Sequence, residues 1–127
     1  MRNIYKISLF TLFVSTFLIT PILAQKWEQK DVKQEELNRK YKIAQQLMKN
    51  GRLEQAREIY STLHQQKPGQ REYLLDYIKL LEQMGKYEEM EKVLQDYLDI
   101  NPGDLDAWLR LGQAYYNKGD KKKAFDQ

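Results

Sequence analysis

The sequence NPGDLDAWLRLGQAYYNKGD spans residues 101–120 and carries four residues at a strict spacing. Trp108, Leu111, Gly112 and Tyr115 follow one another at intervals of three, one and three residues. In a helix with 3.6 residues per turn, this spacing places all four on one face. An apolar stripe that includes a glycine predicts a helix that packs closely against a neighbour.

The turn-forming residues recur with one period along the chain. Gly51, Gly85 and Gly119 are separated by 34 residues each, and the Pro-Gly pairs at 68–69 and 102–103 are also 34 residues apart. A fixed period of this length is typical of repeat proteins in which each unit is one supersecondary element. Glycine favours the turn after a helix, and proline does not continue one. We therefore expect two helices in each period.

Between these turns the apolar residues recur at three-to-four spacing, which predicts helices. The expected helices cover residues 40–50, 52–66, 72–84, 86–100 and 105–118, and a further helix begins at residue 120. The apolar stripe of the first of them is Tyr41, Ile43, Ala44, Leu47 and Met48. No alternating apolar pattern of strand length is visible. The expected fold is all-α, a stack of antiparallel helix pairs.

The pattern resembles the tetratricopeptide repeat, which opens with the Trp-x-x-Leu-Gly-x-x-Tyr string found at 108–115 and continues to an alanine, an aromatic residue and a proline. The resemblance implies a right-handed superhelical α-solenoid over residues 37–127, with units 37–70, 71–104 and a partial unit 105–127. In the first unit Lys40 stands where the tryptophan would be. The residues expected to pack the repeats together are Ala44, Ala56, Ile78, Met90, Trp108, Leu111, Gly112, Tyr115 and Ala124.

The second unit departs from this pattern at two positions that hold small residues in the other units. Ile78 aligns with Ala44 and Gly112, and Met90 aligns with Ala56 and Ala124. Bulkier side chains at such contacts hold helices apart, and methionine fills irregular gaps. We expect the two helices of this unit to lie farther apart or to cross at another angle.

The chain begins with a segment that has the order of a secretory signal peptide. Residues 1–6 are short and basic, residues 7–24 are apolar and uncharged, and a polar sequence follows Ala24. We expect Pro21 to break the leader helix and cleavage to follow Ala24, which would place the protein in the periplasm or envelope of a bacterium. The alternative is an uncleaved membrane anchor over residues 7–23. Residues 25–36 form a polar segment that extends the first helix.

The charge balance gives no electrostatic reason to expect a nucleic acid or an anionic membrane as partner. Removing residues 1–24 takes away two of the 21 basic residues and none of the 18 acidic ones, which leaves a net charge of +1. Proteins that bind polyanions through charge carry a marked basic excess. The expected partner is therefore a protein, with no nucleic acid, and with a membrane only if the leader is retained.

No residues have the spacing of a catalytic, metal or cofactor site. The chain has no cysteine and a single histidine, so a His/Cys metal site lacks ligands. We expect His64, beside Gln65 and Gln66, to be solvated, and Glu88, Glu89 and Glu91 to be an ordinary charged helix surface. The expectation is a non-enzymatic protein without cofactor.

The resemblance also implies a concave groove formed by the first helix of each pair, which holds an extended peptide or a partner helix. Its mixture of apolar, aromatic and amide side chains suits a protein ligand. The alternative for any one of them is simple exposure, or cover by the N-terminal segment. By helical phase the groove side chains are Asn38, Tyr41, Gln45, Met48, Glu72, Leu75, Lys79, Glu82, Asp106, Leu109, Gln113 and Tyr116.

Some members of this family grip a C-terminal carboxylate with lysine, asparagine and arginine side chains. Here the matching positions hold Tyr41, Gln45, Asp76, Asp106 and Arg110. Two aspartates would repel a carboxylate, so we expect this clamp to be missing.

These observations favour a protein-interaction scaffold, and two alternatives stay open. In the first alternative the chain is the N-terminal recruiting module of an exported enzyme whose catalytic domain follows Gln127. In the second it is a membrane-tethered assembly factor. The last helix is too short to cover Leu111, Ala114 and Tyr115. An uncovered apolar face at the end of a repeat array lowers solubility, so we expect the sequence to be part of a longer chain. The alternative is that a partner or a dimer mate covers this end.

Overall fold

The computed structural model describes the backbone of residues 4–119 and the side chains of residues 21–119. Within these residues the secondary structure is helical, without any strand, as the sequence predicts. The chain divides into two parts, residues 1–37 and residues 38–127. The helices are α1 (Ile4–Lys49), α2 (Leu53–Gln66), α3 (Arg71–Gln83), α4 (Tyr87–Leu98) and α5 (Leu105–Lys118).

The first part is helical through Pro21, so the expected break at this proline is wrong. A proline removes one backbone hydrogen bond from a helix, but helix-forming residues follow it here without a glycine or a turn signal. From Pro21 to Glu36 every side chain is exposed. Among the described residues, no helix offers a stretch both long and apolar enough to span a bilayer. Most of the proposed leader lies outside the described side chains, so its cleavage stays a prediction.

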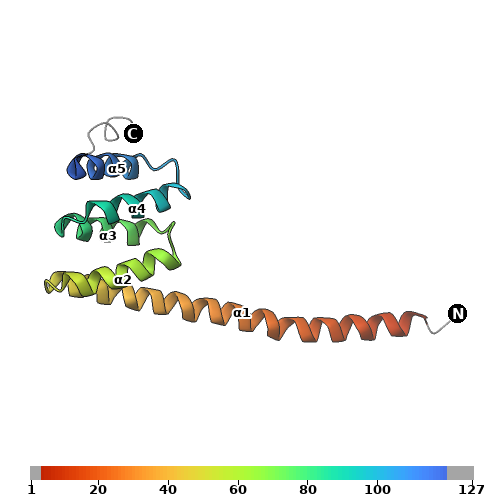
Figure 1. Cartoon of the computed structure of the whole chain (residues 1–127). Helices are drawn as coiled ribbons and strands as arrows, with labels where there is room; N and C mark the ends of the chain where they lie inside the picture. Colours follow the sequence, from red (N-terminus) through yellow and green to blue (C-terminus); the bar gives the residue numbers. More distant parts are fainter. Residues whose placement is uncertain (1–3, 120–127) are drawn as a thin grey trace. The chain divides into compact units, whose positions relative to one another are not determined.

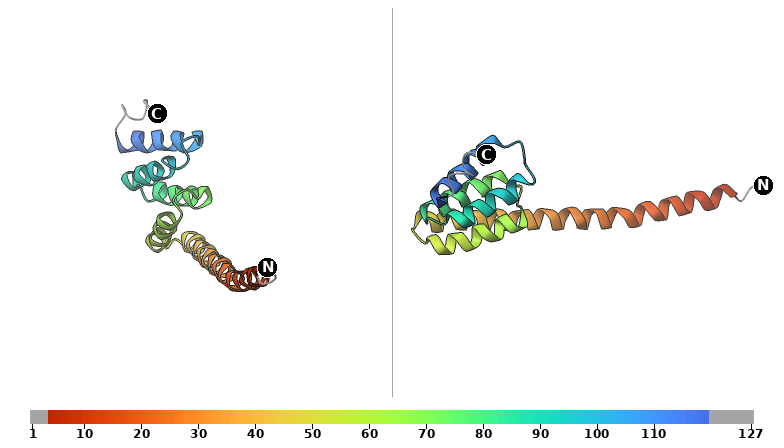
Figure 2. Two further views of the ribbon diagram at one scale, coloured as in Figure 1. Left: turned by 90° about the vertical axis from the view of Figure 1, so that its right-hand side faces the viewer. Right: turned by 45° about the horizontal axis from the view of Figure 1, so that its top comes forward.

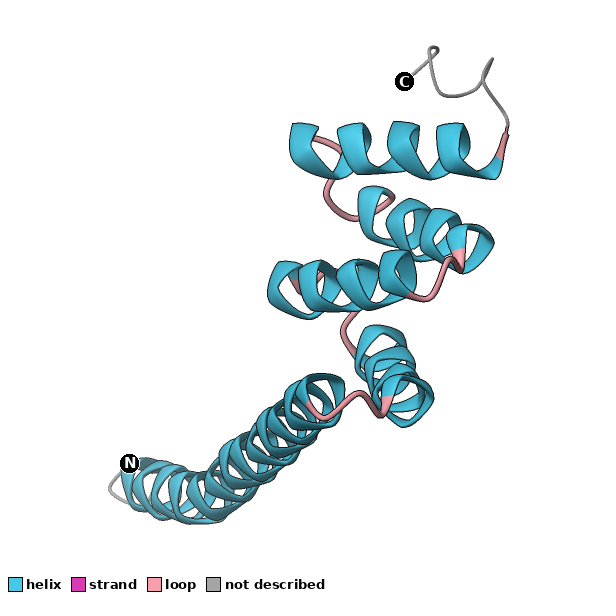
Figure 3. Cartoon of the chain, turned by 90° about the vertical axis from the view of Figure 1, so that its left-hand side faces the viewer, coloured by secondary structure: helices cyan, strands magenta, loops and turns pink. Residues whose placement is uncertain are grey.

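In the second part, successive helices pack on one another in chain order. Helix α3 contacts α2 and α4, and α4 also contacts α5. The connecting loops alternate between the two ends of the stack, so consecutive helices run antiparallel (Figure 1). Helices α3 and α5 run in similar directions, whereas α2 and α4 lie at an angle to them (Figures 2 and 3). This is the predicted stack of paired helices.

The helix ends fall at the predicted breakers. Helices α2 and α4 end shortly before the two Pro-Gly pairs, although α4 stops at Leu98 rather than at residue 100. The turn glycines at 51, 85 and 119 all have positive φ, between +68° and +91°. At the Pro-Gly pair in the α2–α3 loop, a Cβ on Gly69 would lie 3.1 Å from Cγ2 of Ile100. Residue 69 therefore needs to be small because another loop approaches it.

The core follows the predicted apolar stripes, with one exception on the first of them. Ile43 is 52% exposed although it was expected inside. It lies about 100° around the helix from buried Ala44, outside the arc that the neighbouring helices cover. The buried residues of the second part are Ala44, Ala56, Tyr60, Leu63, His64, Tyr73, Leu74, Tyr77, Ile78, Leu80, Leu81, Met90, Val93, Leu94, Tyr97, Leu98, Ala107, Leu111, Ala114 and Tyr115.

Most of the expected repeat-packing residues are buried, and Trp108 and Gly112 are half-buried. Ala124 and the helix expected from residue 120 lie outside the described residues. Ile78 and Met90 are fully inside, at 0% and 1% exposure. The wider spacing that they predict for the second unit stays a prediction.

One glutamate ties three helices together. Glu89 on α4 accepts a hydrogen bond from the Tyr77 hydroxyl on α3 and is paired with the Arg57 guanidinium on α2, whose Nη1 lies 3.0 Å from Oε2. Glu89 was expected to belong to an ordinary charged helix surface, but its side chain is only 29% exposed. Its two partners are 12 and 32 residues away in sequence, beyond the reach of a local charge pattern.

Candidate protein-binding face

The first helices of the three repeats carry the residues predicted for the groove. These helices are the end of α1 (residues 38–49), α3 and α5, and we call the surface formed by their predicted groove residues the A-helix face. Several of these residues form hydrogen bonds between neighbouring first helices, at sequence separations of 31 to 35 residues. The period of the sequence thus corresponds to a series of polar contacts between neighbouring first helices, which we call the ladder.

Between α1 and α3 the ladder is built on Asp76. Its Oδ2 accepts hydrogen bonds from the Tyr41 hydroxyl at 2.7 Å and from the Gln45 amide at 2.9 Å. Burial and the bond to this carboxylate raise the pKa of Tyr41, so the hydroxyl keeps its proton and donates. The Tyr41 ring also contacts the Tyr60 and Tyr73 rings, with centroids 6.1 and 5.0 Å away. Tyr41 therefore supports the repeat interface as well as facing the groove.

Between α3 and α5 the ladder has two contacts. The Gln113 amide donates to Oε1 of Glu82 at 3.1 Å. The Arg71 guanidinium donates to Oδ2 of Asp106 at 3.1 Å, and Arg110 donates to the same oxygen. Two aspartates that were singled out at the clamp positions, 76 and 106, are thus already engaged by donors from the chain itself.

The remaining predicted groove residues differ in exposure. Leu109 is 74% exposed and Tyr116 is 57% exposed, both on α5. They are separated by about two helical turns, so they lie on the same face of α5. Large apolar side chains that are this exposed offer contact area to a partner. Asn38, Glu72 and Lys79 are also exposed, whereas Met48 and Leu75 are half-buried.

A pocket of about 380 Å³ lies on this face where α1, α2 and α3 meet. It includes three of the predicted groove residues and Asp76 from the clamp positions, whereas Lys49, Tyr60 and Gln83 were not predicted to face the groove. The lining residues are Gln45, Met48, Lys49, Tyr60, Asp76, Lys79 and Gln83.

Tyr60 brings an unusual group to this pocket. The residue is 0% exposed, and its hydroxyl is buried without a hydrogen-bond partner. Burial raises its pKa, and the neighbouring Asp76 carboxylate raises it further. A buried hydroxyl without a partner costs about 1–3 kcal/mol. The sequence alone predicts Tyr60 as core and carries no signal for this unsatisfied group.

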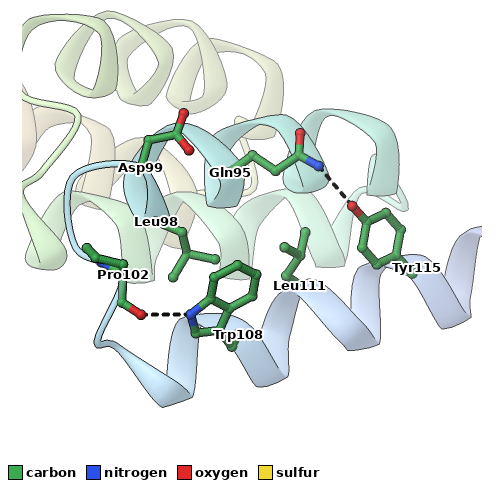
Figure 4. A pocket seen from close by; sticks show the side chains of 7 residues that line it. All are labelled: Gln95, Leu98, Asp99, Pro102, Trp108, Leu111 and Tyr115. Atoms are coloured by element: carbon green, nitrogen blue, oxygen red, sulfur yellow. Dashed lines mark hydrogen bonds between the residues drawn. The ribbon is translucent and has the colours of Figure 1, made fainter. Parts of the chain in front are cut away.

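A second hollow, of about 490 Å³ and lined by different residues from the first pocket, opens between α4 and α5 (Figure 4). Trp108 lies at its edge and donates from Nε1 to the backbone oxygen of Pro102 at 2.9 Å. At the other end the Gln95 amide donates to the Tyr115 hydroxyl at 2.8 Å. Three residues of the string that reveals the repeat, Trp108, Leu111 and Tyr115, thus line this hollow.

His64 is buried, and the expectation that it is solvated is wrong. Its exposed fraction is 5%, its ring lies against Tyr77 on α3, and Nε2 is 3.6 Å from Oδ2 of Asp96 on α4. Local sequence gives no hint of this, because the covering groups come from the next repeat. Burial lowers the pKa of His64, and the attraction of Asp96 offsets this only in part.

We therefore expect the domain to lose stability as the pH falls from about 7 to about 5.5. The folded-state pKa lies below the unfolded value, so the unfolded chain binds the proton more readily and gains population as His64 is titrated. Urea unfolding at the two pH values measures the change. His64 is the single histidine of the chain. In His64→Leu the free energy of unfolding should vary less over this range, and an equal pH dependence would refute the assignment.

The fold and face described above define an α-solenoid of paired helices. Family models of the tetratricopeptide repeat match residues 71–114 and residues 105–126. Over residues 71–126, a little under half of the chain, the sequence therefore matches the tetratricopeptide repeat. No curated protein matches the chain.

Solved structures show the same fold. MamA from Desulfovibrio magneticus RS-1 is 19% identical with a TM-score of 0.59, over 71% of this chain and 51% of that one. The tetratricopeptide-repeat domain of Sgt2 from Aspergillus fumigatus is 21% identical with a TM-score of 0.60, over 72% of this chain and 60% of that one. The chain thus spans about half the length of the MamA structure.

Within the described residues, no cluster of three or more His, Asp or Glu side chains has the arrangement to hold a metal ion. Two acidic groups of the A-helix face, Glu82 on α3 and Asp106 on α5, are instead each bonded to a donor from a neighbouring repeat. The chemistry that this face offers is hydrogen bonding and apolar contact.

Proposed function

We propose that the protein is a non-enzymatic interaction scaffold of the bacterial cell envelope, which binds a peptide or helix of a partner protein along the A-helix face. The observation that carries the proposal is the line of side chains on α1, α3 and α5, cross-linked by hydrogen bonds and ending in exposed Leu109 and Tyr116. A surface preformed in this way loses little conformational entropy on binding.

The leader-like residues 1–24 support export to the envelope. If the leader is removed, protein purified from the envelope should begin at Gln25, which the mass of the intact chain measures. A mass that includes residues 1–24 would contradict cleavage.

The binding proposal is tested on the exposed end of the face. We expect the double variant Leu109→Ala and Tyr116→Ala to lose most of the partner that the unchanged chain captures from envelope extract, about tenfold or more, because a few large side chains, tyrosine prominent among them, carry most of the binding energy of an interface. Both side chains are more than half exposed, so the thermal midpoint should change little. These positions suit the test better than Tyr41, whose removal would also disturb the repeat interface.

Ile43→Ala is the matched control. Ile43 is 52% exposed and apolar like the tested residues, but it lies on the side of α1 away from the pocket-lining residues. Capture should persist in this control. Equal capture by the double variant and the unchanged chain would refute binding on this face.

A further inference from the structure

Three carboxylates on or beside the A-helix face are already paired within the chain. Asp76 on α3 accepts two hydrogen bonds from side chains of α1, at 2.7 and 2.9 Å. Glu82 accepts from the Gln113 amide on α5, and Asp106 forms an ion pair with Arg71. Donors bonded to a carboxylate offset part of its negative potential, so these groups act less strongly on a ligand than free carboxylates do.

Two lysines of the same face have no such partner. Lys49 on α1 and Lys79 on α3 line the pocket where α1, α2 and α3 meet, and both side chains are exposed. In the part of the chain that the structure describes, neither ammonium group forms an ion pair or a hydrogen bond. The pocket therefore presents two positive charges that the chain itself does not neutralise.

The charge balance of the pocket favours an anionic ligand. Its lining holds two lysines and one aspartate, which leaves a net charge of +1. Asp76 is half-buried and bonded to Tyr41 and Gln45, so the exposed lysines are more accessible to a ligand than this carboxylate is. Glu72, an exposed acidic residue of the face, does not line the pocket. Charge complementarity at a binding surface favours a ligand of the opposite sign.

The remaining lining residues suit a carboxylate carried on a side chain. Gln83 adds an amide donor, and Met48 adds an apolar wall for methylene groups. A glutamate or aspartate can place its carboxylate in a pocket while its main chain stays on the surface of the groove. A chain-terminal carboxylate is attached directly to the main chain, so backbone would have to enter the pocket with it. The volume of about 380 Å³ is ample for one side chain.

We infer that the protein segment bound on the A-helix face carries an aspartate or glutamate whose carboxylate binds at Lys49 and Lys79, an inference that rests on the proposed function. The partner segment is thus acidic over this pocket and apolar where it crosses Leu109 and Tyr116 on α5. Neither lysine is at a position of the C-terminal carboxylate clamp, so this subsite is separate from the clamp that the sequence argues against.

The test begins with a selection of random peptides on the full chain. Each peptide is displayed with its C-terminus fused to a carrier, so that only side chains supply carboxylates. We expect aspartate and glutamate to be about threefold more frequent in the selected peptides than in the starting library, the effect of one or two exposed ion pairs. Selected peptides without an acidic excess, or a selection that returns no binding peptide, would overturn the inference.

The variant that isolates the two charges is Lys49→Gln with Lys79→Gln. It should bind a selected acidic peptide about five- to tenfold more weakly than the unchanged chain, and the difference should shrink at high ionic strength. Lys92→Gln is the matched control, because Lys92 on α4 is also an exposed lysine without a partner among the described residues, but it does not line the pocket. Equal affinity of the double variant and the unchanged chain would contradict the assignment.

Exchange of glutamate for glutamine in the peptide completes the comparison. It should weaken binding to the unchanged chain and have little further effect in the double lysine variant, since coupled groups lose their interaction only once. A second library with free C-termini separates the two sources of a carboxylate. If its peptides bind at the lysines through the terminal carboxylate alone, the assignment to an acidic side chain is wrong.

The inference and the proposed function fail in different ways. If the selected peptides lack acidic residues while the Leu109 and Tyr116 variant still loses the envelope partner, the carboxylate subsite fails and the proposed function stands. If that variant captures the partner as before, the proposed function fails, and with it the placement of an acidic segment on this face. Neither residue of that variant lines the pocket.

Discussion

Leu94→Ala should lower the free energy of unfolding by about 2–5 kcal/mol, the usual cost of truncating a fully buried leucine. Leu94 is 0% exposed and lies on α4, the helix that contacts both α3 and α5. In a repeat array each unit is stabilised by its neighbours, so a cavity inside α4's packing weakens the array as well as the helix. A small domain has little stability in reserve, and the variant should be largely unfolded at moderate urea concentrations.

Urea unfolding followed by circular dichroism measures this effect. Leu109→Ala is the matched control, since the same atoms are removed from a side chain that is 74% exposed, and the expected change is within about 0.5 kcal/mol. A loss of less than about 1 kcal/mol for Leu94→Ala would mean that α4 is not packed on both sides as described.

Gly85→Val should cost about 2 kcal/mol or more, because φ at this residue is +68°. A residue with a Cβ strains in this left-handed conformation, and a β-branched residue strains most. A Cβ at this position would meet nothing within 4 Å, so the cost comes from the backbone rather than from a clash. The thermal midpoint and the urea midpoint should both fall.

Two further variants separate backbone strain from other effects of the substitution. Gly85→Asn should cost less than the valine variant, since asparagine tolerates this conformation better. Gly103→Val should be close to neutral. Gly103 lies in a loop, its φ is not positive, and nothing lies near the position of a Cβ. Equal losses of stability in Gly85→Val and Gly103→Val would show that positive φ does not explain the glycines that recur with the repeat period.

The repeat architecture could be read from sequence because its signals are local. The glycine that ends a helix and the proline that cannot continue one act within a few residues, and their recurrence reveals the period. The helix ends accordingly fall within one or two residues of the predicted ones, apart from the start of α1. Pro21 misled the prediction because a proline weakens a helix without always ending it.

The candidate site was predictable only in outline. Helical phase identified residues of the A-helix face, yet it could not show that Tyr41 and Gln45 are bonded to Asp76, more than 30 residues away. The same limitation applies to His64, which looks solvated among glutamines until α3 and α4 cover it. Helical periodicity predicts the direction in which a side chain points, but it does not predict which residues of other helices lie opposite that side chain.

Periodicity and turn chemistry are properties of short stretches of chain, and they were sufficient to predict an all-helical stack and the order of its units. The pairing of Glu89 with two other helices, the burial of His64 and the unpaired hydroxyl of Tyr60 arose only when the repeats were packed. Each depends on groups of other helices, and the distance between such groups is decided by the way the helices pack together.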